Sequence, residues 1–299
     1  MDYSILIPVY NEDVSALVKR LHSQICKLDK PGELILLDDA SPSYSQRLRN
    51  RKLAELSSVK YVQLDNNTGR SAVRNQLADL SIGKNLIFLD ADVSIPDEYF
   101  LKRYQDYFDK EQVVVGGHEY TREKPKPSLL LNWNYGRKYE SKPAAKRNQN
   151  AYGGFISMNF MIPRQWIKKN KFPEDVTGWG HEDTLFGHLL KKEKLPVIHI
   201  DNPVIHLGLS ETSVFLKKQR EAIRQAILLA ERYPEFSYRL SKFYCDLPGL
   251  MKKALHGTSW LLLPLLSHLC RLTHSPLILN IYKLVFFASV QKKKNHKKD

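Results

Sequence analysis

The sequence predicts an α/β protein with a mostly parallel central sheet flanked by helices and a helical extension at the C-terminus. Three observations carry this expectation. The first hundred residues alternate short apolar runs with helix-spaced apolar residues, polar clusters follow the apolar runs, and the last fifth changes to apolar stretches bordered by lysines. At 299 residues and 42% hydrophobic content, the chain has enough apolar surface to form a large folded core.

The first four expected strands are short apolar runs, at Tyr3–Ile7, Leu34–Leu37, Val59–Leu64 and Leu86–Leu89. Helix-spaced apolar residues separate the first run from the second, between Val14 and Leu28. They also separate the third run from the fourth, between Ala72 and Leu80. Strands separated by helices of this length imply a parallel sheet with helices on both faces.

The middle of the chain is less regular. Residues 122–150 are rich in Lys, Arg and Pro, which is typical of a long mobile loop, here with a helical piece. Helices are expected at Thr184–Leu190 and Thr212–Arg232. Further strands are expected at Val113–Val115, Phe155–Ile162, Val197–Ile200 and Val204–Leu207.

The C-terminal part differs in composition. Lys253 and Arg271 enclose 17 uncharged residues that Gly257 and Pro264 interrupt, and a second apolar patch precedes a lysine cluster. This stretch is too short and too broken for a membrane span, which needs about 20 apolar residues. Attachment in the plane of a membrane surface is favoured, and a helical pair packed on protein is the alternative.

The net charge and the cysteine content of the chain indicate its expected partners and cellular compartment. The net charge is +14, and the last 55 residues hold half of it. Nucleic acid is not expected as a partner, because the tail lacks interleaved aromatic residues after Phe287 and the sheet edge is acidic. The three cysteines lie far apart and no secretory signal precedes Tyr3, so a cytoplasmic protein is expected.

Polar clusters follow the first four expected strands. In a parallel sheet the carboxyl ends of the strands lie on one edge, so the four clusters should line one crevice. Turn chemistry alone could explain any one of them, but not so readily four in succession. The clusters are Pro8-Val9-Tyr10-Asn11-Glu12, Asp38-Asp39-Ala40-Ser41, Asn66-Asn67-Thr68-Gly69-Arg70 and Asp90-Ala91-Asp92.

The carboxylates of Asp90 and Asp92 are two positions apart across the small Ala91. Two like charges held together need a cation, or one of them must be protonated. Oxygen ligands suit Mg²⁺ or Mn²⁺, and these ions favour a diphosphate as a further ligand. The chain has neither a G-x-G-x-x-G nor a P-loop motif, so a nucleotide would be held through side chains and a metal.

A second constellation is Gly178-Trp179-Gly180-His181-Glu182-Asp183. It favours a tryptophan wall for a sugar ring beside a carboxylate base, although acids at a helix start are also common helix-end chemistry. It is not a zinc-protease motif, since position 185 is Leu185. His206, at the end of an apolar strand, is either structural or a ligand.

The ordered set ILIPVYNE (5–12), LLDDAS (36–41), NNTGRSAVRN (66–75), IFLDADVSIP (87–96) and GWGHEDTLF (178–186) resembles the family 2 glycosyltransferases of the GT-A fold. The resemblance covers about residues 1–210. It implies a GT-A core at 1–210, with a nucleotide-binding half at about 1–95 and an acceptor-binding half at about 96–210. Residues 211–299 then form the helical extension.

The resemblance also implies roles for individual residues. Asp183 would be the catalytic base, Glu182 and Trp179 would hold the acceptor, and His181, where many relatives carry a small residue, would shape acceptor choice. Asp90, Asp92 and His206 would bind Mn²⁺ or Mg²⁺. The residues expected to contact the nucleotide-sugar are Pro8, Val9, Tyr10, Asn11, Glu12, Asp39, Gly69, Arg70, Arg74, Asp90, Ala91 and Asp92, with Arg74 alternatively a structural partner of the acids.

The expected function is therefore inverting transfer of a sugar from a nucleotide diphosphate-sugar, UDP favoured, to a hydroxyl of a glycan or lipid-linked acceptor in cell-surface polysaccharide synthesis. The enzyme would be peripheral on the inner face of the plasma membrane. The alternative is a catalytically silent scaffold, which predicts damaged motifs, whereas both acids of the metal pair and Asp183 are intact. A sugar-nucleotide pyrophosphorylase is disfavoured, because the loop after the first strand is not glycine-rich.

Overall fold

The computed structural model describes residues 1–295 apart from 175–177, 179, 234–235 and 237. The chain divides into two compact units, each made of three segments. We call Met1–Thr121, Ser141–Thr177 and Glu182–Gly208 the sheet unit, and Arg122–Glu140, Gly178–His181 and Leu209–Asp299 the helical unit. Residues 122–140 and 178–181, expected in the core by sequence, thus group with the C-terminal helices.

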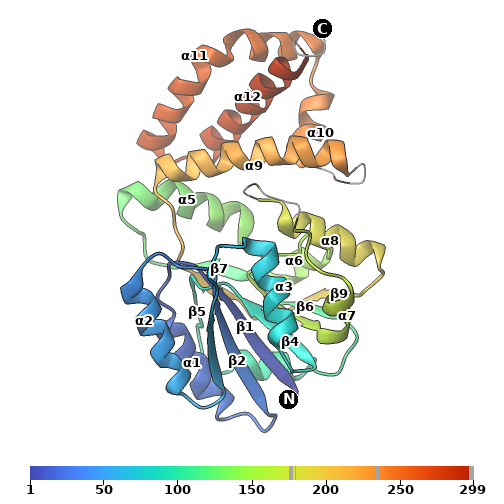
Figure 1. Cartoon of the computed structure of the whole chain (residues 1–299). Coiled ribbons are helices and arrows are strands. Elements are labelled where there is room, and N and C mark those ends of the chain that lie inside the picture. Colours follow the sequence, from blue (N-terminus) through green and yellow to red (C-terminus); the bar gives the residue numbers. More distant parts are fainter. Residues whose placement is uncertain (175–177, 179, 234–235, 237, 296–299) are drawn as a thin grey trace. The chain divides into compact units, whose positions relative to one another are not determined.

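The sheet unit is built on a seven-stranded sheet of order β3-β2-β1-β4-β8-β6-β9 (Figure 1). All neighbouring strands are parallel except that β8 runs antiparallel to β4 and β6, so the predicted mostly parallel sheet is confirmed. The strands are β1 (Tyr3–Val9), β2 (Gly32–Asp38), β3 (Val59–Gln63), β4 (Asn85–Leu89), β6 (Val113–Val115), β8 (Asn159–Pro163) and β9 (Val197–His199).

Alternation along the central strands supplies a core on each face of this sheet. Ile5 and Ile7 of β1 join one apolar cluster, whereas Leu6 joins the other. The first cluster includes residues of α1 (Ser15–Ile25) and α4 (Phe100–Gln105), and the second includes residues of α3 (Arg70–Leu80), α7 (Arg164–Lys169) and α8 (Glu182–Lys192). The outer elements α2 (Tyr44–Lys52), the 3₁₀ turn Leu53–Glu55 and α6 (Ala144–Asn148) complete the unit.

A second, three-stranded sheet of order β5-β10-β7 connects the end of β4 to the region beyond β6. Its strands are β5 (Val93–Ser94), β7 (His118–Tyr120) and β10 (Val204–His206). The pairing places His206 opposite Val93 on one side and Tyr120 on the other. This small sheet places His206 beside the loop that follows β4.

The helical unit contains α5 (Leu130–Tyr135), α9 (Thr212–Arg232), α10 (Arg239–Asp246), α11 (Gly249–Thr273) and α12 (Pro276–Asn295). The helices α11 and α12 lie side by side as a hairpin (Figure 1), and His274 reverses the chain in the left-handed conformation with φ 50°. Gly257 and Pro264, which interrupt the apolar stretch in sequence, both lie within α11. None of the described helices is both long and apolar enough to cross a bilayer.

Two further expectations needed correction. The strand expected at Phe155–Ile162 begins only at Asn159, where pairing with Leu89 of β4 starts. The stretch 122–150 is largely helical: it holds the turn Pro127–Leu129, α5, the π-helical segment Gly136–Glu140 and α6. Leu131 and Trp133 are buried, so tertiary packing outweighs a local composition that favours a loop.

Candidate active site

The loops after β1, β2 and β3 are joined at the carboxyl edge of the sheet. Asp39 accepts hydrogen bonds from Thr68 N (2.6 Å), Thr68 Oγ1 (2.9 Å) and Gly69 N (3.0 Å). Asn11 N donates to Ser41 Oγ at 2.7 Å. Three of the four polar clusters thus meet, as expected, and Asp39 uses both carboxylate oxygens to shape the loop.

Two non-glycine residues in these loops hold positive backbone angles, Asn11 with φ 54° and Ala40 with φ 59°. Such conformations are uncommon and cluster at functional sites. Just before Asn11, the side chain of Tyr10 is 53% exposed, whereas Val9 is 1% exposed. Tyr10 is therefore available to a ligand, and Val9 contributes its backbone and its packing in the core.

The loop after β4 lies within electrostatic reach of the loop after β1. Burial raises the pKa of Glu12, and the negative charge of Asp92 raises it further. The intervening Ala91 packs against the apolar core beneath β1. Asp90 and Asp92 have different partners, although only Ala91 separates them: Asp90 pairs with Arg74, and Asp92 lies beside His206.

Asp90 is held by a buried arginine from α3. Arg74 Nη2 lies 2.7 Å from Asp90 Oδ1, and Arg74 is 4% exposed. Burial raises the pKa of Asp90, while the positive charge of Arg74 opposes that rise. Arg74 also donates to the carbonyl oxygen of Arg70 at 3.3 Å, so it fixes both the acid and the start of α3. This arrangement favours the interpretation of Arg74 as a structural partner of the acids.

Asp92 faces His206. Asp92 Oδ2 lies 3.4 Å from His206 Nε2, and Leu207 N donates to the Asp92 carbonyl oxygen at 2.8 Å. Burial disfavours the Asp92 carboxylate, yet the interaction with His206 holds its pKa below the usual range. The small sheet thus brings together two residues that are more than a hundred positions apart.

Gly208 lets the backbone come close to this pair. A Cβ at Gly208 would overlap the Asp92 carboxylate and would lie 3.0 Å from His206 Nε2. An oxygen donor and an imidazole nitrogen this close together fit a divalent cation that takes its other ligands from a diphosphate. Within the described part of the chain no three His, Cys, Asp or Glu side chains converge as a complete protein cage. Asp90 is engaged by Arg74.

The start of α8 brings two further acids to the same edge. Glu182 Oε1 lies 3.1 Å from Arg70 Nη1, which joins the start of α8 to the start of α3. Asp183 has an oxygen, Oδ1, that is buried without a hydrogen-bond partner. Burial and the neighbouring charge of Glu182 raise the pKa of Asp183 to about 7, against the attraction of Arg74. A carboxylic acid that titrates near neutrality can take a proton from a hydroxyl group.

The residues just before α8 have a different setting. His181, with φ 73°, packs its ring against Phe236 and Tyr238, and its Nε2 lies 3.1 Å from the Ala222 carbonyl oxygen. These contacts are all within the helical unit. Trp179 lies outside the described residues, so its expected place as a sugar wall remains a prediction.

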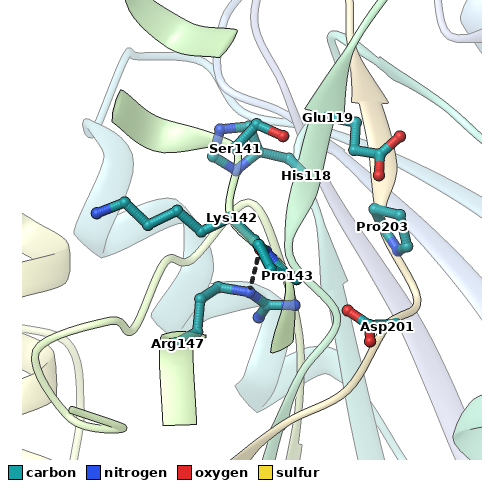
Figure 2. Close-up of a pocket in the computed structure, with 8 residues that line it drawn as sticks. All are labelled: His118, Glu119, Ser141, Lys142, Pro143, Arg147, Asp201 and Pro203. Carbon is teal, nitrogen blue, oxygen red and sulfur yellow. Dashed lines mark hydrogen bonds between the residues drawn. The ribbon is translucent and has the colours of Figure 1, made fainter. Parts of the chain in front are cut away.

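Sequence reasoning missed a polar cluster behind the small sheet. A pocket of about 350 Å³ lies beside β7. Figure 2 shows its lining, which includes His118, Glu119, Lys142, Arg147 and Asp201. Arg147 directs its guanidinium at the carbonyl oxygens of residues 115, 116, 142 and 200 and at the ring of His199. All of its N–H groups are therefore engaged, and it braces the β6–β7 turn rather than offering charge to a ligand.

His118 connects this pocket to the candidate site. Its ring packs edge-on against His206, with centroids 6.2 Å apart, and burial lowers its pKa to about 4. His118 is therefore neutral at pH 7 and adds no positive charge beside His206 and Asp92. The one sequence signal was the Gly116-Gly117 pair: a side chain at Gly117, where φ is 84°, would collide with the Arg147 guanidinium.

The sequence profile of the family described as "Glycosyl transferase family 2" matches residues 4–170, which is more than half of the chain. The chain belongs to glycosyl transferase family 2. The matched range contains all four polar loops and the Asp90–Asp92 pair, and it ends before Asp183 and His206.

Two curated relatives illustrate the range of this family. An undecaprenyl-phosphate 4-deoxy-4-formamido-L-arabinose transferase of Pectobacterium atrosepticum is 33% identical over 116 residues, which are 38% of this chain and 35% of that protein. The chain thus spans about a third of the length of that relative. An uncharacterized glycosyltransferase of Haemophilus influenzae is 25% identical over 221 residues, 74% of this chain and 84% of its own length.

Solved structures confirm the fold. The mannosyltransferase PcManGT of Pyrobaculum calidifontis, solved in complex with GDP-Man and Mn²⁺, gives a TM-score of 0.62 at 17% identity and covers 97% of this chain and 86% of its own. Staphylococcus aureus TarS gives a TM-score of 0.50 at 20% identity, with 98% and 92% covered. The family 2 chain described here therefore has the expected GT-A architecture, with C-terminal helices attached.

Proposed function

We propose that this glycosyltransferase moves a sugar from a nucleotide diphosphate-sugar to an acceptor hydroxyl, with inversion, and that Asp183 is the base. The observation that carries this proposal is the half-buried carboxyl of Asp183, whose pKa is raised to about 7. The acid lies at the same sheet edge as Asp90 and Asp92. As the acceptor oxygen attacks, its proton passes to the Asp183 carboxylate.

The donor end of the site would be the edge formed by the loops after β1 to β4. Tyr10 and Asn11 are exposed there and would contact the base and ribose, with Pro8, Val9 and Asp39 holding the loops in shape. Gly69 and Arg70 would lie along the diphosphate. We favour uridine as the base, as expected from sequence.

Asp92 and His206 would hold Mn²⁺ or Mg²⁺ between them, where Gly208 lets the backbone come close, with Asp90 in support. The ion would stabilise the negative charge that develops on the departing diphosphate. The Mn²⁺ found with the mannosyltransferase PcManGT supports this proposal. What the chain itself supplies is a buried carboxylate, an imidazole and the ion pair of Arg74 with Asp90 that keeps the loop in place.

For the acceptor we propose a glycan or a lipid-linked molecule, held by Glu182 and Trp179, in the synthesis of a cell-surface polysaccharide. The relative named as an undecaprenyl-phosphate transferase supports a lipid-linked acceptor. Such a substrate is consistent with an enzyme peripheral on the inner face of the plasma membrane. The C-terminal helices and the lysine-rich end would provide the attachment.

The test is the Asp183→Asn variant, with Asp79→Asn as the matched control. Asp79 is half-exposed at the far end of α3 and pairs with Lys171, so it carries the same substitution away from the site. We expect Asp183→Asn to bind UDP in the presence of Mn²⁺ like the wild type and to lose transfer. Transfer at a near wild-type rate by Asp183→Asn would show that another group is the base.

Chelation tests the metal separately. Removal of divalent ions with EDTA should stop turnover, and added Mn²⁺ should restore it. Full activity in EDTA would exclude the role proposed for Asp92 and His206 and leave the role of Asp183 standing.

A further inference from the structure

The helix α11 is apolar on two opposite sides. One side is covered, with Ser259, Leu266 and Cys270 buried against neighbouring helices of the unit. The other side is open: Leu250, Leu261, Leu265 and Leu272 are 81, 55, 50 and 64% exposed. No charged residue occurs from Ala254 to Cys270. A helix that is apolar all round normally has an apolar environment on both sides, so the open side calls for a partner.

The exposed leucines form one stripe. At 3.6 residues per turn, Leu250, Leu261, Leu265 and Leu272 fall within a sector of roughly 60°, about opposite the buried side. At 1.5 Å per residue the stripe is about 33 Å long. We call these four residues the outer stripe of α11. Ala254 and His268 fall in the same sector, and no charged residue falls in it between Leu250 and Leu272.

One border of the stripe carries the residues typical of a membrane interface. Trp260, which is 75% exposed, lies beside the helical positions of Lys253 and Arg271. Tryptophan prefers the headgroup level of a bilayer, and lysine and arginine reach lipid phosphates from the edge of an apolar face. The neighbouring helix adds Leu277 and Ile281, which are 61 and 44% exposed.

The charge of the helical unit decides between possible partners. Its three segments hold 21 Lys and Arg against 8 Asp and Glu, so it carries +13 of the +14 of the whole chain. A second copy docked on the stripe would bring the same charge against itself. An anionic lipid surface has the opposite charge, and each basic residue near it contributes about 1 kcal/mol.

We propose that the outer stripe of α11 is the lipid-binding face of this enzyme, and that α11 lies in the plane of an anionic membrane. The leucines would enter the acyl boundary, with Trp260 at the headgroups and Lys253 and Arg271 on lipid phosphates. This inference rests on the membrane attachment proposed above. The inference assigns the membrane attachment to one face of α11. The lysine-rich end would add electrostatic attraction to the anionic lipids.

The experiment uses the full chain and vesicles of phosphatidylcholine, alone or mixed with phosphatidylglycerol. We expect binding to the mixed vesicles and much weaker binding to phosphatidylcholine alone. The double variant Leu261→Glu/Leu265→Glu should bind the mixed vesicles at least about tenfold more weakly, since each carboxylate would have to enter the acyl boundary. The control is Leu228→Glu on α9, 57% exposed and outside the stripe, which should bind like the wild type.

The fluorescence of Trp260 can report directly how deeply α11 enters the bilayer. Brominated lipids should quench part of the tryptophan fluorescence of the wild type, and Trp260→Phe should lose most of that quenching while it still binds. Melting curves should be alike for the wild type and the variants, because the replaced side chains are exposed. Binding of Leu261→Glu/Leu265→Glu equal to that of the wild type would overturn the proposed face.

The remaining outcomes separate the proposals. Absence of wild-type binding to mixed vesicles would overturn both the stripe and the membrane attachment. Loss of a concentration-dependent dimer in Leu261→Glu/Leu265→Glu would assign the stripe to a second copy and overturn the lipid proposal. UDP binding with Mn²⁺ should be unchanged in every stripe variant, so the transfer function is judged independently.

Discussion

Replacing Asp183 with asparagine should make this protein more stable above pH 4, although it removes the proposed base. The pKa of Asp183 is raised from 3.8 to about 7 in the folded chain. Because each pKa unit corresponds to about 1.4 kcal/mol, ionising this side chain costs about 4 kcal/mol more in the folded protein than in the unfolded chain. The asparagine of the variant would have no such cost, since an amide does not ionise.

The sign follows from which state releases the proton first. The unfolded chain loses the Asp183 proton above about pH 4, whereas the folded protein keeps it to about pH 7. Wild-type stability therefore falls through this window relative to Asp183→Asn and runs parallel to it above pH 7. The advantage of the variant should grow by about 1.4 kcal/mol per pH unit between about pH 4 and 7, and level off near 4 kcal/mol.

Urea unfolding of both proteins at several pH values from about 5 to 8 measures this difference. Asp79→Asn, exposed at the end of α3, should differ from the wild type by no more than about 0.5 kcal/mol throughout. A difference between Asp183→Asn and wild type that does not change with pH would refute the reasoning. The Asp183 carboxyl would then titrate in its ordinary range, and the argument for a base poised near neutrality would fail.

Three other predictions concern the same region. The kcat/KM for transfer should rise about tenfold per pH unit below pH 7 and level off above it, as Asp183 releases its proton; a rate profile without that limb would contradict the base assignment. Gly208→Ala should bind UDP with Mn²⁺ at least about tenfold more weakly by calorimetry, because its Cβ would collide with the Asp92 carboxylate and displace it from His206; unchanged affinity would place the ion elsewhere. Asn159→Ala should lower the free energy of unfolding by about 3 kcal/mol in urea titrations, because it removes the buried amide that bonds to Tyr104 and to the carbonyl oxygens of residues 117 and 202; a loss under about 1 kcal/mol would show that water replaces the amide.

Much of the fold follows from local patterns in the sequence. The buried strands β1, β2 and β4 are continuous apolar runs, and α9 occurs at the predicted Thr212–Arg232. The direction of β8 could not be foreseen, because an apolar run has no sign of its orientation. Its first residue, Asn159, is fully buried and bonded to three partners, whereas an asparagine in sequence favours a turn.

The sequence predicts where the candidate site lies, but it does not predict which side chains contact each other there. Strand ends locate the loops, so Asp90 and Asp92 were expected at the carboxyl edge of the sheet, whereas the role of Asp183 came from the family resemblance. That Asp92 faces His206 depends on pairing in the small sheet, and no local pattern specifies such pairing. That Asp90 is taken by Arg74 depends on how α3 packs beside the end of β4. The raised pKa of Asp183 likewise arises from burial and neighbours that meet only after folding.

The division of the chain has a practical consequence for anyone who wishes to cut it. Because each unit consists of three segments, the polypeptide passes from one to the other five times. A protein ended at Gly208 would keep Arg122–Glu140 but lose the helices that cover Leu131, which is fully buried. The coding sequence of the helical unit is therefore interrupted by that of the sheet unit. Domain shuffling or fusion that treats the helical unit as a C-terminal tail should yield insoluble protein.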